Sequence, residues 1–366
     1  MDPRKAKELL DAGRARLIDV RSQPEAHLER IPGAELVPLA GLAGWAAERK
    51  PEPLVLYCAS GRRSQRGVAR LRDELGWSRV EHVDGGLEAW RAAGLPVEGG
   101  SRLGEAQRRR YARQLVLEGF GEQGQRRLIE GSALILGAGG LGSPAALYLA
   151  AAGVGRIGIA DDDAVEVSNL QRQVLHSQLR VGMPKARSAA KTLLDLNPQI
   201  RVETHERRLD AGNVIELIRG YDVVVDGTDN FATRYLVGDA AARLQIPVVS
   251  ASILAFQGQV SVFSPPEGPC YRCLYPEPPP AELAPGCGTA GVLGSMAGTI
   301  GALQATEAVK LLAGIGRPLI GRLLIYDALE AAWSELRAHR DPACPVCSSP
   351  AAPEDPFPDY VTFCDR

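Results

Sequence analysis

The stretch that most constrains the fold of this chain is residues 132–143, which read SALILGAGGLGS. The apolar run at its start is typical of a buried strand. Gly137, Gly139 and Gly142 follow at the spacing G-x-G-x-x-G, and a helix of small residues is expected directly after them. In such a strand–turn–helix unit the glycines let backbone N–H groups approach phosphate oxygens, and the helix N-terminus favours their negative charge. The sequence therefore predicts that this stretch binds a nucleotide.

Side chains after the following strands suit the sugar and the phosphates of that nucleotide. Asp161 ends the next expected strand, about twenty residues beyond the glycines, where an acidic residue binds ribose hydroxyls. Arg172 and Lys185 are cations on intervening segments and suit a polyphosphate. Asp229 follows a later strand and suits Mg²⁺, which prefers one or two carboxylates together with phosphate oxygens. A nicotinamide oxidoreductase is the alternative that the glycines alone allow, but it has no use for this combination of side chains.

Expected strands and helices alternate along the chain, which is typical of an α/β fold with parallel sheets. We expect a small α/β domain over residues 1–98, a flexible linker over 99–104, a doubly wound nucleotide-binding domain over 105–347 and a tail over 348–366. With 366 residues, the chain is long enough to build two cores of this kind.

Composition and charge exclude several function classes. A net charge of −2 and a charged fraction of 23% argue against binding to nucleic acid or to a membrane surface. The longest apolar segment, residues 290–314, carries Gln304, Glu307 and Lys310, so we expect a buried helix there rather than a membrane span. No apolar segment follows the first residues, so we expect no secretory signal. Seven cysteines, an odd number, fit reactive thiols and a metal site in a reducing cytoplasm.

Two C-x-x-C pairs predict a metal site. The pairs are Cys270 with Cys273, and Cys344 with Cys347. Four thiolates from two such pairs suit tetrahedral Zn²⁺. The alternative, two redox-active pairs, requires a strand that feeds directly into a helix, and neither pair has that setting. We therefore expect a structural Zn²⁺ that joins the two segments.

A separate cysteine, Cys58, follows the expected strand 54–57 and begins the loop CASGRR. A thiol between the end of a parallel strand and a helix start meets converging backbone N–H groups, and Arg62 and Arg63 add positive charge. Both effects lower the pKa of a thiol and stabilise an anionic persulfide. The alternative is a buried structural cysteine.

The first domain resembles a single-domain rhodanese over essentially residues 1–98. The motifs that carry the resemblance are LIDVR at 17–21, IPGA at 31–34, C-x-x-G-x-R at 58–63 and VDGGLEAW at 83–90. The resemblance implies a sulfurtransferase in which Cys58 carries sulfane sulfur as a persulfide. The loop amides and Arg63 are then implied to surround that sulfur.

The second domain resembles the ubiquitin-activating-type adenylyltransferases of the ThiF and MoeB kind over about residues 103–347. The motifs are R-Y-x-R-Q at 110–114, G-x-G-G-L-G-S at 137–143, D-x-D at 161–163, SNLQRQ at 168–173, Lys185 and TDN at 228–230. The residues thereby implied to bind ATP are Gly137, Gly139, Gly140, Gly142, Asp161, Asp163, Asn169, Arg172 and Lys185, with Asp229 for Mg²⁺. Arg113 is implied to reach the ATP of a partner protomer, which implies a homodimer.

The resemblance also implies the substrate, which is the C-terminal carboxylate of a ubiquitin-like sulfur-carrier protein ending in Gly-Gly.

Cys287 ends a proline-rich stretch before the expected apolar helix, whose dipole favours a thiolate. Its position resembles the crossover-loop cysteine of the family, which takes part in sulfur transfer or in covalent attachment to the carrier. The alternative for Cys287 is an incidental small residue.

The whole chain is thus expected to join a rhodanese-like α/β domain to a Rossmann-like, doubly wound, mostly parallel domain with a zinc knuckle. It would adenylate the carrier with ATP and Mg²⁺ and take sulfur from thiosulfate or a cysteine desulfurase persulfide at Cys58. Cys287 would then release the carrier thiocarboxylate. The pathway stays open among molybdopterin, thiamin, cysteine and tRNA thiolation. The alternative is a scaffold or sensor that binds ATP and the carrier without turnover.

Overall fold

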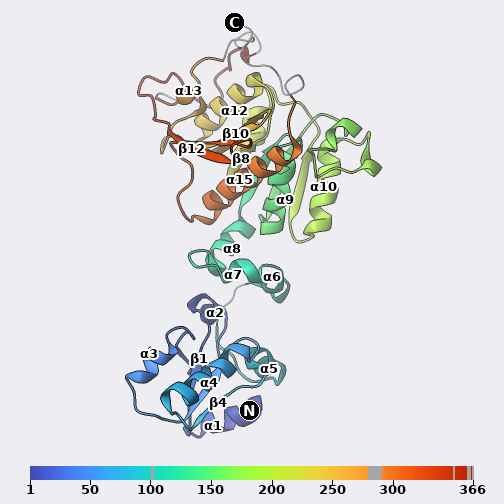
Figure 1. The fold of residues 1–366 in the computed structure, drawn as a ribbon. Helices are drawn as coiled ribbons and strands as arrows, with labels where there is room; N and C mark the ends of the chain where they lie inside the picture. The colour runs from blue at the N-terminus through green and yellow to red at the C-terminus, as the bar shows by residue number, and fades with distance from the viewer. Residues whose placement is uncertain (100–102, 279–290, 349–350, 361–363, 365–366) are drawn as a thin grey trace. The chain divides into compact units, whose positions relative to one another are not determined.

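A computed structural model of the chain describes residues 1–99, 103–278, 291–348, 351–360 and 364 (Figure 1). The chain divides into two compact units, Met1–Glu122 and Gln123–Arg366. The predicted linker at 99–104 lies partly outside the described residues, and the predicted domain boundaries stay predictions.

The first unit is built on a parallel sheet with the strand order β2-β1-β3-β4. Its strands are β1 (Arg16–Asp19), β2 (Glu35–Leu36), β3 (Leu54–Tyr57) and β4 (Val80–His82). Its helices are α1 (Pro3–Asp11), α2 (Gln23–Leu28), α3 (Leu42–Ala47), α4 (Arg62–Leu75), α5 (Gly86–Ala92), α6 (Glu105–Arg110) and α7 (Ala112–Leu115).

The central strands of this sheet are buried on both faces. Successive side chains of a strand point to opposite sides, so neighbouring residues pack in different apolar clusters. Ile18 and Leu56 belong to one apolar cluster. Leu17 and Val55 belong to the cluster on the other face. Cys58 comes directly after β3, at the edge where the carboxyl ends of the parallel strands meet.

The second unit contains an eight-stranded sheet with the order β12-β11-β10-β9-β8-β5-β6-β7. Its strands are β5 (Ser132–Leu136), β6 (Arg156–Ala160), β7 (Arg201–His205), β8 (Val223–Asp226), β9 (Val248–Leu254), β10 (Gln257–Phe263), β11 (Arg322–Asp327) and β12 (Ala332–Arg337). Strands β9, β8, β5, β6 and β7 pair in parallel, and β10 to β12 extend the sheet in antiparallel pairs.

Helices cover both faces of this larger sheet (Figure 1). The helices of this part of the chain are α8 (Gly121–Glu130), α9 (Gly142–Ala152), α10 (Lys185–Leu196), α11 (Val214–Arg219), α12 (Phe231–Leu244), α13 (Tyr271–Leu274) and α15 (Gly294–Ala313), with short 3₁₀ turns η1 (Val167–Asn169) and η2 (Gln178–Arg180). Helices α10, α9 and α15 pack side by side in that order on one face. Helices α11 and α12 share an apolar core with Leu134, Leu136 and Val224 on the other. The predicted doubly wound α/β fold is confirmed.

The chain order of the parallel strands creates a switch point between β5 and β8. From β5 the chain builds β6 and β7 on one side, and it then builds β8 and β9 on the other. Ligands of open α/β sheets bind in the crevice outside the carboxyl ends of strands at such a point.

The long apolar segment forms α15, as expected. Gln304 and Glu307 are almost fully buried within it. Among the helices of the described residues, none has both the length and the apolar character needed to cross a membrane.

Candidate functional site

In the glycine-rich turn between β5 and α9, the backbone of Gly142 approaches that of Gly137 very closely. Gly137 adopts a φ of +84°, which other residues rarely adopt. A Cβ atom on Gly142 would lie 1.8 Å from the carbonyl oxygen of Gly137, so only glycine fits there. The turn therefore brings the start of α9 directly over the end of β5, as phosphate binding by helix N–H groups requires.

Asp161 is tied to this turn from the end of β6. Its Oδ2 accepts the Ala138 N–H at 2.7 Å, and its Oδ1 accepts the Asp163 N–H at 2.9 Å. Burial raises the pKa of Asp161, and these amide contacts together with Lys185 offset only part of that effect. The carboxylate is thus fixed in orientation at the switch point, where we predict that it binds ribose.

A pocket of about 730 Å³ opens at the switch point, and it gathers most of the predicted nucleotide ligands. The predicted residues that line it are Gly137, Gly139, Gly140, Asp161, Asp163, Arg172, Lys185 and Asp229. These residues come from the ends of β5, β6 and β8 and from the segments that follow them. The pocket combines a glycine cradle, exposed carboxylates and five cationic side chains, which is a donor set that suits a nucleoside triphosphate with a metal ion. The cationic residues are Arg172, Lys185, Arg207, Arg208 and Arg234.

Lys185 reaches the pocket from the first residue of α10 and is held by a carboxylate. Its Nζ lies 2.7 Å from Asp163 Oδ2, and its backbone N–H donates to the Asp163 carbonyl at 2.8 Å. The Lys185 side chain is only 8% exposed, whereas that of Asp163 is 68% exposed. Asp163 therefore orients the ammonium group toward the pocket.

Several predicted residues lie elsewhere. Gly142 forms the tight turn itself. Asn169 is buried, and its Oδ1 accepts the Glu166 N–H at 3.1 Å at the start of η1. Arg113 is exposed on α7 of the first unit. Cys287 lies outside the described residues. The roles predicted for these residues stay predictions.

The pocket also contains polar residues that the sequence analysis missed. Gln173 lines it and is 4% exposed, and its Oε1 is buried without a hydrogen-bond partner among the described residues. Arg234 donates to the carbonyls of Thr228 and Ala251 at 2.6 and 2.9 Å, and so holds the loop that carries Asp229. Gln173 directly follows Arg172 in the SNLQRQ motif, and this position could have indicated that it lines the pocket. No local sequence pattern indicated the role of Arg234.

In the first unit, Cys58 is buried at the start of the predicted loop. Its Sγ accepts the backbone N–H of Ser64 at 3.5 Å and lies 3.6 Å from the Ser64 hydroxyl. Burial raises the pKa of Cys58, but the Ser64 contacts and the amides of Arg63 and Ser60 outweigh it, so the pKa lies below its ordinary value. A structural cysteine has no need of this arrangement, so the geometry favours a reactive thiol.

The Cys58 loop also depends on a glycine of α5. A Cβ atom on Gly86 would lie 2.3 Å from the Cys58 carbonyl oxygen and 2.7 Å from that of Ala59. The N–H groups of Leu87 and Glu88 donate to these same two carbonyls. The loop backbone is therefore packed directly on the start of α5.

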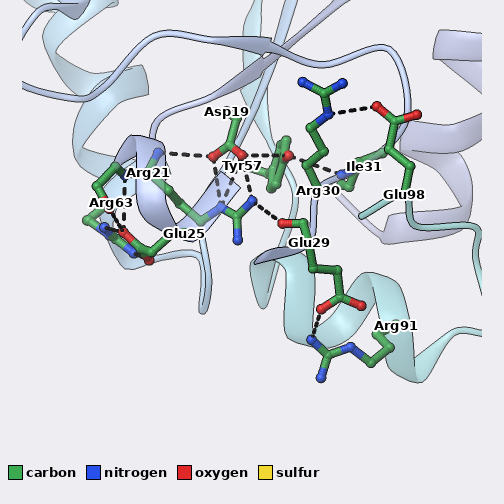
Figure 2. Close-up of polar contacts among 11 residues, drawn as sticks. Asp19, Arg21, Glu25, Glu29, Arg30, Ile31, Tyr57, Arg63, Arg91 and Glu98 are labelled. Atoms are coloured by element: carbon green, nitrogen blue, oxygen red, sulfur yellow. Dashed lines mark hydrogen bonds and ion pairs between the residues drawn. The ribbon is translucent and has the colours of Figure 1, made fainter. Parts of the chain in front are cut away.

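Arg63 is paired with a carboxylate in this structure. Figure 2 shows its guanidinium facing Glu25, with Nη1–Oε2 and Nη2–Oε1 distances of 2.8 and 2.6 Å. Burial alone would raise the pKa of Glu25, but Arg63 and Ser22 lower it to about 2, so the pair stays ionised at neutral pH. Glu25 therefore offsets part of the Arg63 charge, while Arg63 also interacts electrostatically with the Cys58 thiol.

A buried network anchors the segment that carries Glu25 (Figure 2). Arg21 donates to Asp19 through Nε and Nη2 and to the Glu29 carbonyl at 2.7 Å. The Tyr57 hydroxyl donates to Asp19 at 2.7 Å and accepts the Ile31 N–H at 3.1 Å. This network explains why the LIDVR motif belongs to the site, because its charges fix α2 beside the Cys58 loop.

The four paired cysteines form a compact cluster in the second unit. The Sγ atoms of Cys270 and Cys344 are 3.5 Å apart, and those of Cys273 and Cys347 are 3.4 Å apart. Four thiolates about 2.3 Å from one Zn²⁺ stand about 3.8 Å apart in a tetrahedron, whereas a disulfide is about 2.0 Å long. The cluster therefore fits a tetrahedral metal ion.

The cluster is joined to the core by a buried ion pair. Arg272, between two of the cysteines, donates through Nε to both carboxylate oxygens of Asp239 on α12, at 3.0 and 3.1 Å. The Tyr360 hydroxyl donates to the same carboxylate at 2.6 Å. The segment that carries Cys270 and Cys273 and the Tyr360 side chain thus both contact Asp239 on α12.

The fold and the pocket define a nucleotide-binding α/β protein, and comparisons with known proteins agree with this class. The ThiF family pattern matches residues 111–346, and the rhodanese-like domain pattern matches residues 2–93. The chain therefore belongs to the ThiF family and carries a rhodanese-like domain before the ThiF region.

Curated relatives are about half identical to the ThiF region. The sulfur carrier protein adenylyltransferase of Thermus thermophilus is 51% identical over 260 residues, which cover 70% of this chain and 96% of that protein. The adenylyltransferase and sulfurtransferase MOCS3 of Drosophila yakuba is 52% identical over 257 residues, or 70% of this chain. The match spans only 56% of the MOCS3 protein.

Solved structures of E. coli MccB share the fold. MccB with ATP aligns with a TM-score of 0.59 at 22% identity, over 69% of this chain and 77% of that chain. MccB alone aligns with a TM-score of 0.60 at 22% identity. At this identity the likeness establishes the fold alone.

Removal of the Ser64 hydroxyl is expected to make Cys58 less reactive. Ser64→Ala removes a hydroxyl that contacts Sγ at 3.6 Å and the Gly61 carbonyl of the same loop at 3.0 Å. The pKa of Cys58 should therefore rise, and the thiolate fraction at neutral pH should fall. The rate of iodoacetamide alkylation at Cys58, followed by peptide mass spectrometry, should fall by about threefold or more at pH 7. Ser78→Ala, an exposed serine of the same unit, is the control. An unchanged rate in Ser64→Ala would show that the amides alone set the reactivity.

Proposed function

We propose that this chain is an adenylyltransferase and sulfurtransferase that converts the C-terminal glycine of a ubiquitin-like sulfur carrier into a thiocarboxylate. The observation that carries this proposal is the presence in one chain of a triphosphate-type pocket and an activated thiol. The named adenylyltransferase and sulfurtransferase relatives support the same function. The carrier has a C-terminal Gly-Gly, which is small enough to enter a pocket of this size.

In the first step, a carboxylate oxygen of the carrier attacks the α-phosphorus of ATP. An acyl-adenylate forms and pyrophosphate leaves. Lys185 and Arg172 neutralise the charge that accumulates on the phosphates, and the glycine turn orients them for in-line attack. No general base is needed, because the attacking carboxylate is already ionised.

Asp229 and its neighbours suit the Mg²⁺ that accompanies ATP. Asp229 is exposed at the pocket wall, and Arg234 holds the backbone beside it. Bound Mg²⁺ would screen the charge of the phosphate oxygens. Asp229 would supply one carboxylate ligand, and oxygens of ATP and water would complete the coordination. Asp161, Asp162 and Asp163 line the same pocket and form a second group of carboxylates that could hold a metal ion.

In the second step, a persulfide on Cys58 attacks the acyl carbon and displaces AMP. The product is an acyl disulfide between the carrier and Cys58. The Cys287 thiolate then attacks the Cys58 sulfur, which releases the carrier thiocarboxylate and leaves a Cys58–Cys287 disulfide for reduction by a cellular thiol. A chemistry of persulfides and thiolates belongs in a reducing compartment, so we place it in the cytoplasm. Thiosulfate or a cysteine desulfurase persulfide supplies the sulfur.

We also infer that two chains associate. Apolar side chains are exposed along one segment of the second unit: Val167 is 61% exposed, Val174 57% and Leu179 96%. A run of exposed apolar side chains is typical of a protein interface. A dimer through this segment agrees with the role predicted for Arg113, which is to reach the ATP of a partner.

The first experiment separates the two steps. Asp229→Asn should lower ATP–pyrophosphate exchange, assayed with a panel of Gly-Gly carriers, by about a hundredfold or more, because a metal ligand is lost. Cys58→Ala should keep full exchange and form no carrier thiocarboxylate by mass spectrometry. Asp195→Asn, on the exposed side of α10, is the charge control. Failure of every carrier to support exchange would favour the scaffold alternative, and thiocarboxylate formation by Cys58→Ala would refute the role of the thiol.

The second experiment tests the metal. The intact chain should bind one Zn²⁺, as measured by elemental mass spectrometry, and Cys273→Ser should lose it with a large loss of stability, because structural zinc contributes directly to folding. Cys364→Ser, outside the cluster, should retain the metal. Full zinc content in Cys273→Ser would contradict the predicted ligand set.

The third experiment tests association. Leu179→Glu should shift the sedimenting species from two chains to one, because it places a charge in the proposed interface. Leu329→Glu alters another side chain that is exposed on the second unit and serves as the control. A wild-type chain that sediments as a monomer at micromolar concentration would contradict the dimer.

A further inference from the structure

The Ala138 peptide lies at the centre of the glycine-rich turn and is bound on both sides. Its N–H donates to Asp161 at 2.7 Å. Its carbonyl accepts the Ser143 hydroxyl at 3.2 Å and lies 2.9 Å from Nε2 of His176. The orientation of this peptide decides where the following N–H groups of the turn point.

His176 bridges this peptide to helix α10. The residue is 8% exposed, and its Nδ1 lies 2.9 Å from the Ser188 hydroxyl of α10. A carbonyl oxygen can only accept, so Nε2 must carry the proton, and Nδ1 of the neutral ring then accepts from Ser188. Burial lowers the pKa of His176, and the nearby Lys185 and Arg180 lower it further, while the Ala138 carbonyl opposes them.

The segment that carries His176 is fixed firmly to α10. Arg180 Nη1 donates to the Ser188 carbonyl at 2.5 Å and to Thr192 Oγ1 at 2.7 Å. Thr192 in turn donates to the Leu175 carbonyl at 2.6 Å. These contacts join residues 175–180 to α10 as one body, which carries Lys185 on α10 and is continuous with Arg172, four residues before His176.

We propose that His176 is a positioning residue for nucleotide binding. Its neutral imidazole sets the distance between the glycine-rich turn and the body that carries Arg172 and Lys185. The backbone N–H groups and the two cations thereby meet the same phosphates. The inference rests on the proposed use of ATP, but it concerns binding and not the transfer steps.

Two polar variants of His176 distinguish its contact with the Ala138 carbonyl from its contact with the Ser188 hydroxyl. The amide nitrogen of glutamine can take the place of Nε2, and that of asparagine the place of Nδ1. His176→Gln should therefore keep the bond to Ala138 and bind ATP within about threefold of wild type. His176→Asn leaves the buried Ala138 carbonyl without this donor and should weaken ATP binding by about tenfold.

ATP binding to the full chain is measured directly by calorimetry, with no carrier present, and the KM for ATP and kcat are measured in pyrophosphate exchange. In His176→Asn we expect Kd and the KM for ATP to rise, while kcat stays within about threefold of wild type. His205→Asn, which alters a half-buried histidine that contacts Tyr221 on the same sheet, should leave Kd unchanged.

Equal Kd values for His176→Gln and His176→Asn would overturn the proposal, because a packing role alone does not distinguish the two amides. A fall in kcat without a change in Kd would overturn it as well. If no carrier supports exchange but His176→Asn still weakens ATP binding, the proposed function fails and the positioning role stands.

Discussion

The close approach of Gly142 to the carbonyl of Gly137 is the constraint on which the second unit depends. It lets α9 begin directly above the end of β5, so that the helix and the strand share one turn. The side chains predicted to bind the nucleotide are placed relative to this turn: Asp161 through the Ala138 N–H, and Lys185 on α10 through His176. A side chain at position 142 would displace the start of α9 and separate these groups. The positions of the charged groups in the pocket therefore depend on the backbone geometry of this turn.

The residues at strand ends were predictable for a physical reason. Parallel strands end at one edge of a sheet, so Asp161 and Asp229 had to lie near the glycine turn once the α/β alternation was recognised. Their neighbours were harder to predict. His176 contacts the carbonyl of Ala138, and Arg234 donates to the carbonyls of Thr228 and Ala251. No local sequence pattern marks a side chain that binds a carbonyl. Asn169 differs from these residues. It belongs to a recognisable motif, but its Oδ1 accepts the nearby Glu166 N–H.

The fold was predictable to a similar degree. Strands buried on both faces are continuous apolar runs, and such runs identified β5 and β8. Strand β12 was missed because every one of its residues is exposed, so it has no hydrophobic alternation to mark it. The cysteine cluster was predictable from spacing alone, since two C-x-x-C pairs constrain four ligands to one point. Its attachment to α12 through Arg272 and Asp239 was not, because a buried ion pair leaves no periodic signal.

Under the proposed function the two units stabilise anions by different means, and the difference follows from what each must release. The second unit would meet a highly charged triphosphate, and its pocket offers full charges from Lys185 and Arg172. The first unit would hold one thiolate or persulfide, and there Glu25 offsets part of the charge of Arg63. Backbone amides and Ser64 then stabilise the sulfur with dipoles. Dipoles favour the anion without binding it as strongly as an uncompensated cation would. The proposed transfer of sulfur to an acyl group is easier when the sulfur is bound in this weaker way.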